Sequence, residues 1–168
     1  MSLPGKIRQL DFAQFWSLFK VFVTRPLYIF PTYKATQETV KIADSLYGSA
    51  HHQNNVTNAF RHALWNFMIA KKCLRQNSSV EKSIDWAQTI TDLHEKLMPN
   101  QNLLKAMDLH NNAVGRKMFA KYHQLNNEKE IIKIFTDLIP EAVKITNTKA
   151  LKDYKNQMVY TEAYEHER

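Results

Sequence analysis

Three segments in the middle of the sequence contain side chains that could bind a metal ion or carry out acid–base chemistry. They read "NAFRHALW" at 58–65, "HE" at 94–95 and "MDLHNNAVGR" at 107–116. Imidazole and carboxylate groups form mixed nitrogen and oxygen sites that suit zinc, manganese or iron, and an ion held in this way can activate water for hydrolysis. An arginine beside such a site is suited to hold an anionic group such as phosphate.

The first segment lies in a helix that we expect at about 57–75. At about 100° per residue, large apolar side chains cover one side of this helix, and Trp65 and Ile69 lie near the opposite side. A helix that is apolar on both sides is normally interior. Arg61 and His62 are therefore predicted to lie in or against the core.

A second helix is expected at about 79–97, with Ser78 and Glu81 forming a capping box at its start. His94 falls in the middle of the apolar stripe of this helix, and Glu95 lies on the margin of the stripe. Both side chains are therefore predicted to point toward neighbouring helices.

A third helix is expected at about 102–122, and Asn111 sits at the centre of its apolar face, flanked by Asp108 and Gly115. Two residues of helical rotation separate Asp108 from His110 by about 160°, so this pair cannot grip one ion on a regular helix. Gly115 costs roughly 1 kcal/mol of helix propensity relative to alanine. We therefore expect another helix or a ligand to approach closely at Gly115.

Buried charges are costly unless they are paired or coordinated, so the inward polar groups of the three helices are expected to meet in one cluster. The predicted catalytic residues are Arg61, His62, Glu95, Asp108 and Asn111. The predicted substrate contacts are Asn58, Trp65, Asn112 and Arg116. The predicted metal ligands are His62, His94, Glu95 and Asp108, with His110 as a second choice.

Three interpretations of this cluster stay open at the level of sequence. In the first, the cluster binds zinc, manganese or iron and hydrolyses a phosphate ester or a similar anionic substrate. In the second, His62 and Glu95 perform acid–base hydrolysis without a metal. In the third, the protein is a non-catalytic binding or interaction domain, in which Arg61 pairs with Glu95 or Asp108 and the other polar groups satisfy one another.

The sequence contains none of the common motifs of other catalytic machinery. It has no G-x-S-x-G elbow, no P-loop and no GxGxxG, and "HEKLM" lacks the second histidine of H-E-x-x-H.

The three motif segments resemble an uncharacterised family of small helical bacterial domains, which occur alone or at the C-terminal ends of large wall-associated and toxin-like proteins. The resemblance covers roughly residues 36–120. It implies a shared site at these residues and names no reaction.

Composition predicts an all-α fold, namely a single-domain bundle of about six helices over residues 1–168. The chain has 44% hydrophobic residues, only three glycines and five prolines, which leaves little material for the turns of a large sheet. The core is expected at 35–160, after an amphipathic aromatic segment at 1–34 and before a polar tail at 161–168. The chain's formal charge of +7 would suit an anionic partner, but the lysines are scattered, so a nucleic-acid partner is not expected.

The N-terminal segment predicts an amphipathic helix at about 11–24, which docks on the core or lies on a membrane surface. Charged residues and prolines interrupt it, so neither a spanning helix nor a signal peptide is expected. With one cysteine, nothing requires an oxidising compartment, and the cytoplasm is the default location. A small molecule or a phospholipid is the expected class of substrate for the hydrolase interpretation.

The remaining parts of the chain give simpler expectations. Prolines predict a connector around 25–34, followed by a short helix that Thr36 caps and Gly48 ends. The adjacent histidines His51 and His52 then fall in a polar loop, where they could ligate a metal, but exposed side chains without a structural role are expected. After residue 127 the pattern predicts one or two further helices, broken near the proline at 140.

Overall fold

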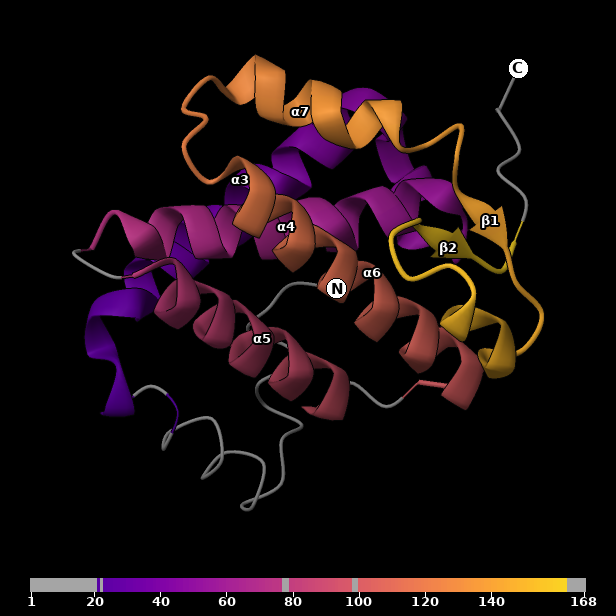
Figure 1. Cartoon of the computed structure of the whole chain (residues 1–168), viewed down its shortest axis with the longest axis horizontal. Coiled ribbons are helices and arrows are strands. Elements are labelled where there is room, and N and C mark those ends of the chain that lie inside the picture. Colours follow the sequence, from indigo (N-terminus) through magenta and orange to yellow (C-terminus); the bar gives the residue numbers. More distant parts are fainter. Residues whose placement is uncertain (1–20, 22, 77–78, 98–99, 163–168) are drawn as a thin grey trace.

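The computed structural model describes residues 21, 23–76, 79–97 and 100–162. These residues form five α-helices, a small two-stranded parallel sheet and three short 3-10 helices (Figure 1). The expected all-α class is therefore confirmed, and the sheet is a minor addition at the C-terminal end.

Helix α3 (Ile29–Tyr47) begins earlier than the sequence suggests, so the connector expected at 25–34 is wrong. Pro31 lies in the first turn, where a backbone N–H has no intrahelical partner and its absence costs little. Thr36 is inside the helix, and its hydroxyl donates to the backbone one turn earlier. Gly48 ends the helix as expected, with a φ of 55° that favours glycine.

The three helices that carry the motifs are α4 (Val56–Leu74), α5 (Val80–Leu97) and α6 (Asn102–Tyr122). They begin and end within one residue of their expected positions. Helix α4, magenta in Figure 1, is central, because α3, α5 and α6 all pack against it. Most of its residues are buried, as a helix that is apolar on both sides requires.

Helices α4 and α6 touch at Gly115, where a side-chain methyl group would overlap the backbone oxygen of Ala63. The close approach that the sequence predicted at Gly115 is therefore confirmed, and the approaching element is helix α4. This contact sets the distance between the helices that carry His62 and Asp108.

A cluster of aromatic rings fills the core beside these helices. Phe67 makes edge contacts with Phe119 and Phe135, and Phe60 makes a further one with Phe135. Cys73 is completely buried in the same core, and burial raises the pKa of its thiol to about 12. The lone cysteine is thus a core residue, as its position within a helix suggests.

The C-terminal part contains one further α-helix, α7 (Glu128–Asp137), and then changes to strands. Strand β1 (Val143–Lys144) pairs in parallel with β2 (Val159–Tyr160), and the 3-10 helix η3 (Thr148–Lys152) lies between them in sequence. A second C-terminal α-helix is therefore absent from the described residues beyond α7.

Several expectations concern residues outside the described ranges. Ser78 is one, and the described neighbour Ser79 instead accepts the backbone N–H of Lys82 with its hydroxyl at the start of α5. Most of the helix expected at 11–24, and the tail after 162, also lie outside them. Among the described helices, none combines the length and hydropathy that crossing a bilayer demands.

Candidate functional site

His62 on α4, Glu95 on α5 and Asp108 on α6 converge at the centre of the three-helix contact. Nδ1 of His62 lies 3.9 Å from Oε1 of Glu95, and Nε2 of His62 lies 3.5 Å from Oδ1 of Asp108. One nitrogen or oxygen atom from each residue lies within 4.8 Å of those of the other two, and all three side chains are buried. The meeting of the inward polar groups is therefore confirmed for these three residues.

A chain of hydrogen bonds determines which nitrogen of His62 carries the proton. The guanidinium of Arg116 can only donate, and its Nη1 lies 2.9 Å from Oδ1 of Asn66. The amide nitrogen of Asn66 then donates to Oδ1 of Asn112 at 2.7 Å, and this oxygen also lies 3.2 Å from Nδ1 of His62. Nδ1 is therefore the donor, which leaves the lone pair of His62 on Nε2.

The lone pair on Nε2 faces two different groups. Nη2 of Arg61 donates to it at 3.1 Å, whereas Oδ1 of Asp108 is itself an acceptor. Burial, and then the positive charge of Arg61, hold the pKa of His62 well below its usual range, so the ring is neutral. A neutral imidazole whose lone pair lies next to a carboxylate oxygen is an arrangement that a cation in place of the Arg61 donor would stabilise.

The two carboxyl groups are buried without full hydrogen bonding. Burial, followed by the nearby Asp108, raises the pKa of Glu95 to about 7. Burial raises the pKa of Asp108 to about 6, against the opposing effect of Arg61. Oε1 of Glu95 and Oδ1 of Asp108 have no hydrogen-bond partner. Buried acceptors of this kind are costly, and in native structures they call for an explanation such as a bound ion.

Arg61 lies at the edge of the cluster and is half-buried. Within the described part of the chain it forms no ion pair with Glu95 or Asp108 at 4.0 Å or less, and its Nε atom has no partner. Burial lowers the pKa of Arg61, although a guanidinium remains charged. The pairing that the structural interpretation required is therefore not formed.

Three of the predicted site residues make other contacts. The amide of Asn111 donates to the backbone oxygen of Val159 and accepts its N–H, both at 2.9 Å, so it anchors β2. Nε2 of His110 contacts a backbone oxygen of the C-terminal segment at 2.9 Å. His94 makes an edge contact with Trp65, with ring centroids 5.2 Å apart, and is not one of the three converging residues.

The predicted substrate contacts differ in their burial and in their hydrogen-bond partners. Trp65 is half-buried, and its Nε1 donates to the hydroxyl of Thr36. The amide oxygen of Asn58 and the amide nitrogen of Asn112 are buried without partners. Their roles in binding stay predictions. Sequence reasoning gave no role to Asn66, although its place on a helix that is apolar on both sides marked it as inward.

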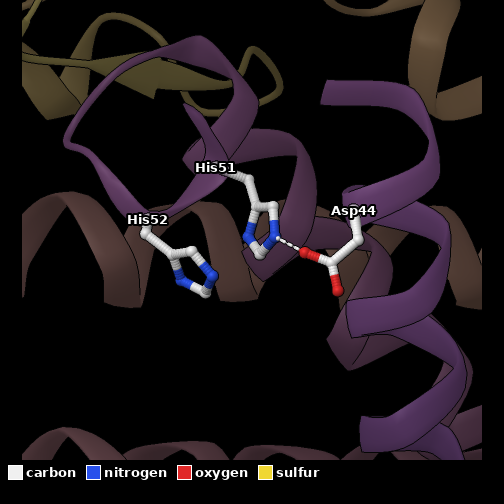
Figure 2. A group of neighbouring side chains, drawn as sticks. All are labelled: Asp44, His51 and His52. Carbon is white, nitrogen blue, oxygen red and sulfur yellow. Dashed lines mark hydrogen bonds and ion pairs between the residues drawn. The ribbon is translucent and has the colours of Figure 1, made fainter. Parts of the chain in front are cut away.

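A second group of side chains lies outside this cluster and corrects the expectation of an exposed histidine loop. Residues Gly48–His52 form the 3-10 helix η2, and His51 is completely buried. His52 is exposed, and Asp44 reaches His51 from helix α3 (Figure 2). These three residues also offer ligand atoms within 4.8 Å of one another.

Comparison with protein families shows a match over most of the chain. A protein-family model described as "Domain of unknown function (DUF6973)" matches residues 19–158. This range extends beyond the expected 36–120 on both sides and includes the start of α3 and nearly all of the C-terminal segment up to β2. No curated protein and no solved structure matches the chain.

Proposed function

The chain belongs to the DUF6973 family, whose description names no activity, and from its site we propose that it is a metal-dependent hydrolase of phosphate esters. His62 through Nε2, with Glu95 and Asp108 through one carboxylate oxygen each, would hold one divalent ion. Arg61 would bind the anionic group of the substrate.

The observation that carries the proposal is a pair of buried carboxylate oxygens that have no hydrogen-bond partner and lie beside the imidazole of His62. Nε2 of His62 and Oδ1 of Asp108 are 3.5 Å apart, and Oε1 of Glu95 lies 3.9 Å from Nδ1 of the same ring. A purely structural cluster would be expected to satisfy these atoms. Here two carboxylate oxygens are buried without partners, and a cation that took the place of the Arg61 donor at Nε2 of His62 would satisfy both.

The ligand types narrow the choice of ion. One imidazole and two carboxylates suit manganese, iron or zinc better than a soft ion that prefers sulfur ligands. Three protein ligands are also the usual number at a catalytic centre, because they leave a coordination position open. An ion held there would supply Lewis acidity to a water and to a phosphate oxygen.

The side chains around the ion position have separate tasks. Arg116, Asn66 and Asn112 keep the proton of His62 on Nδ1, so that the lone pair of the ring stays on Nε2. Arg61 is half-buried and has an unpartnered Nε–H, which leaves it donors for a phosphate oxygen. The chain's formal charge of +7 also favours the approach of an anionic substrate. Phospholipid head groups and nucleotides are both substrates of this chemistry.

One observation favours a metal-free alternative. The pKa of Glu95, at about 7, is near that of an effective general base at neutral pH, and Glu95 lies beside His62. In that mechanism Glu95 would take a proton from water directly. Retention of hydrolysis after dialysis against a strong chelator would support this alternative over the metal-dependent one.

Elemental analysis and a hydrolysis assay test the proposal together. Protein purified without a chelator or a histidine tag should contain, or bind on titration, one manganese, iron or zinc ion at this cluster. It should hydrolyse bis(p-nitrophenyl) phosphate or phospholipid vesicles. His62→Ala and Glu95→Gln should each lower kcat/KM by about 100-fold or more, whereas His123→Ala, which changes a distant histidine, should not.

A negative result is equally clear. Absence of metal, absence of binding on titration and absence of hydrolysis in the unmodified protein would reject the enzyme. Large losses of stability in both His62→Ala and Glu95→Gln would then favour the structural interpretation.

A further inference from the structure

Asp44, His51 and His52 form a second cluster of ligating side chains, which the proposed reaction does not use. Asp44 lies near the end of α3, and the two histidines lie at the end of η2, just before α4 (Figure 2). One ligand atom from each residue lies within 4.8 Å of those of the other two. The cluster joins two elements that are separated in sequence by the glycine turn at Gly48.

The hydrogen bond between His51 and Asp44 fixes the ring of His51. Nε2 of His51 donates to Oδ1 of Asp44 at 2.7 Å, since a carboxylate oxygen accepts. In the neutral ring the lone pair of His51 is consequently on Nδ1. Nδ1 is buried and has no hydrogen-bond partner, and the whole residue is 0% exposed. An unpartnered acceptor in the interior needs an explanation.

His52 supplies a second imidazole on the side of this unpartnered nitrogen. The centroids of the two histidine rings are 4.0 Å apart, with planes inclined by 42°. In Figure 2 the nitrogen of His51 that does not contact Asp44 lies toward the ring of His52. The side chain of His52 is exposed, so an ion can reach this position from solvent.

We propose that His51, through Nδ1, and His52, through a ring nitrogen, bind a second divalent transition-metal ion, with Asp44 as a positioning residue. A carboxylate that accepts the other ring N–H of a ligating histidine is a common arrangement at metal sites, where it fixes the tautomer and raises the basicity of the ring. Water completes the coordination on the solvent side.

The two clusters differ in the ions that they prefer. Two imidazoles favour copper, nickel and zinc, whereas one imidazole and two carboxylates also accept manganese. The second site is therefore selective for nickel over manganese. It ties the end of α3 to the turn that precedes α4, so a bound ion stabilises the fold, and the stabilisation grows with the logarithm of the ion concentration above the dissociation constant.

Zinc titration followed by calorimetry tests the site in the full chain without a tag. His52→Ala removes an exposed ligand and leaves the buried ring in place, so the variant is expected to fold. It should bind one equivalent of zinc less than the unmodified protein. The control His123→Ala removes a histidine elsewhere and should keep the full number of equivalents. Equal stoichiometry in His52→Ala and the unmodified protein overturns the proposal.

This difference is independent of the proposed hydrolase site, because it counts only the equivalent that depends on His52. If the first site does not bind zinc, the unmodified protein binds one equivalent in place of two, and His52→Ala binds none in place of one. The difference of one equivalent between the two proteins remains. A loss of one equivalent in His62→Ala, with none in His52→Ala, rejects the second site alone.

The role of Asp44 has its own test. Asp44→Ala should weaken zinc binding by about 10- to 100-fold, the usual effect of removing a partner of a ligating histidine. Nitrogen-15 spectra of the histidine rings should show zinc shifting Nδ1 of His51 while its Nε2 keeps the proton. Loss of the Nε2 proton on zinc binding, or unchanged affinity in Asp44→Ala, contradicts the positioning role.

Discussion

The proton on Nδ1 of His62 is held in place by a chain of three side chains that begins at Arg116. The direction of each hydrogen bond from Arg116 through Asn66 to Asn112 follows from the one before it, and the last one fixes the imidazole. A neutral His62 is consequently unsuited to act as a general acid. Its lone pair is kept for a cation or for the donor of Arg61.

Stability of the metal-free protein should depend on pH through Glu95. Burial, with Asp108, raises the pKa of Glu95 from 4.5 to about 7, so the folded chain retains this proton more tightly than the unfolded chain. The resulting stabilisation is fully present below about pH 4.5 and is lost as the pH rises through 7. Glu95→Gln stays neutral throughout, so its advantage in unfolding free energy should grow by about 2–3 kcal/mol between pH 4.5 and 8.

Urea unfolding at several pH values, in chelator-treated protein, measures this difference. Glu141→Gln, at an exposed position, is the matched control and should show no such trend. Saturating manganese or zinc should reverse the behaviour of the unmodified protein, because ligand protons must leave before the ion binds. If the difference in unfolding free energy between Glu95→Gln and the unmodified protein does not change with pH, the pKa of Glu95 is not raised.

The sequence located the cluster but not the contacts within it. Helical periodicity shows which side of a helix is inward, and this was enough to bring together His62, Glu95 and Asp108. It does not show which neighbour a side chain meets, so His94 and Asn111 could not be separated from them. Burial of His51 depends on how η2 packs against α3, and no local pattern records that packing.

At the scale of elements, the contact of α4 with α6 at Gly115 should be intolerant of any side chain. Gly115→Ala places a methyl group against the backbone oxygen of Ala63, and backbone cannot move aside as a flexible side chain can. Despite the better helix propensity of alanine, we expect a loss of about 1–3 kcal/mol or more. Thermal unfolding checks this loss. A stabilised Gly115→Ala would contradict the close approach.

Asn111 gives a second prediction at this scale, because its amide replaces a strand partner for Val159. Asn111→Ala should cost about 1–3 kcal/mol by leaving a buried N–H and C=O without partners. Hydrogen exchange at Val159 should accelerate, while metal binding at the His62 cluster should be retained. Loss of metal binding at unchanged stability would instead show that Asn111 contributes to the His62 cluster.

The limits of sequence reasoning differ from one element to another. Helices α4, α5 and α6 are long and strongly periodic, so their bounds could be predicted. Pro31 suggested a break, although a proline in a first helical turn is compatible with the helix. The strands β1 and β2 have two residues each, and their pairing depends on contacts far apart in sequence, which periodicity cannot reveal.

At the scale of the whole molecule, the start of α3 and the 3-10 helix η1 (Pro26–Tyr28) before it present apolar side chains to solvent. Leu27 is 72% exposed and Phe30 is 62% exposed, with Arg25 and Lys34 nearby in sequence. Together with the aromatic segment at 11–24, this surface suits an anionic membrane. Co-sedimentation with anionic vesicles should detect binding that salt weakens and that deletion of 11–24 abolishes.

Two outcomes would change this view of the N-terminal segment. Insoluble protein after the deletion would indicate that residues 11–24 belong to the core. Phe30→Gln is the milder test, because it removes one exposed apolar ring from a helix that stays otherwise intact. Unchanged vesicle binding in Phe30→Gln would separate the described surface from the segment before it.

The single thiol of the chain lies within the aromatic core, where burial raises its pKa to about 12 and removes the reactive thiolate. A thiol reagent can therefore modify Cys73 only when that core opens. The extent of Cys73 modification therefore reports how often the core opens. Mass spectrometry can measure it without an added cysteine. Under conditions where opening limits access at equilibrium, an ion at 100 times its dissociation constant should slow modification about 100-fold. Metals could then be ranked by this single rate before any substrate is known.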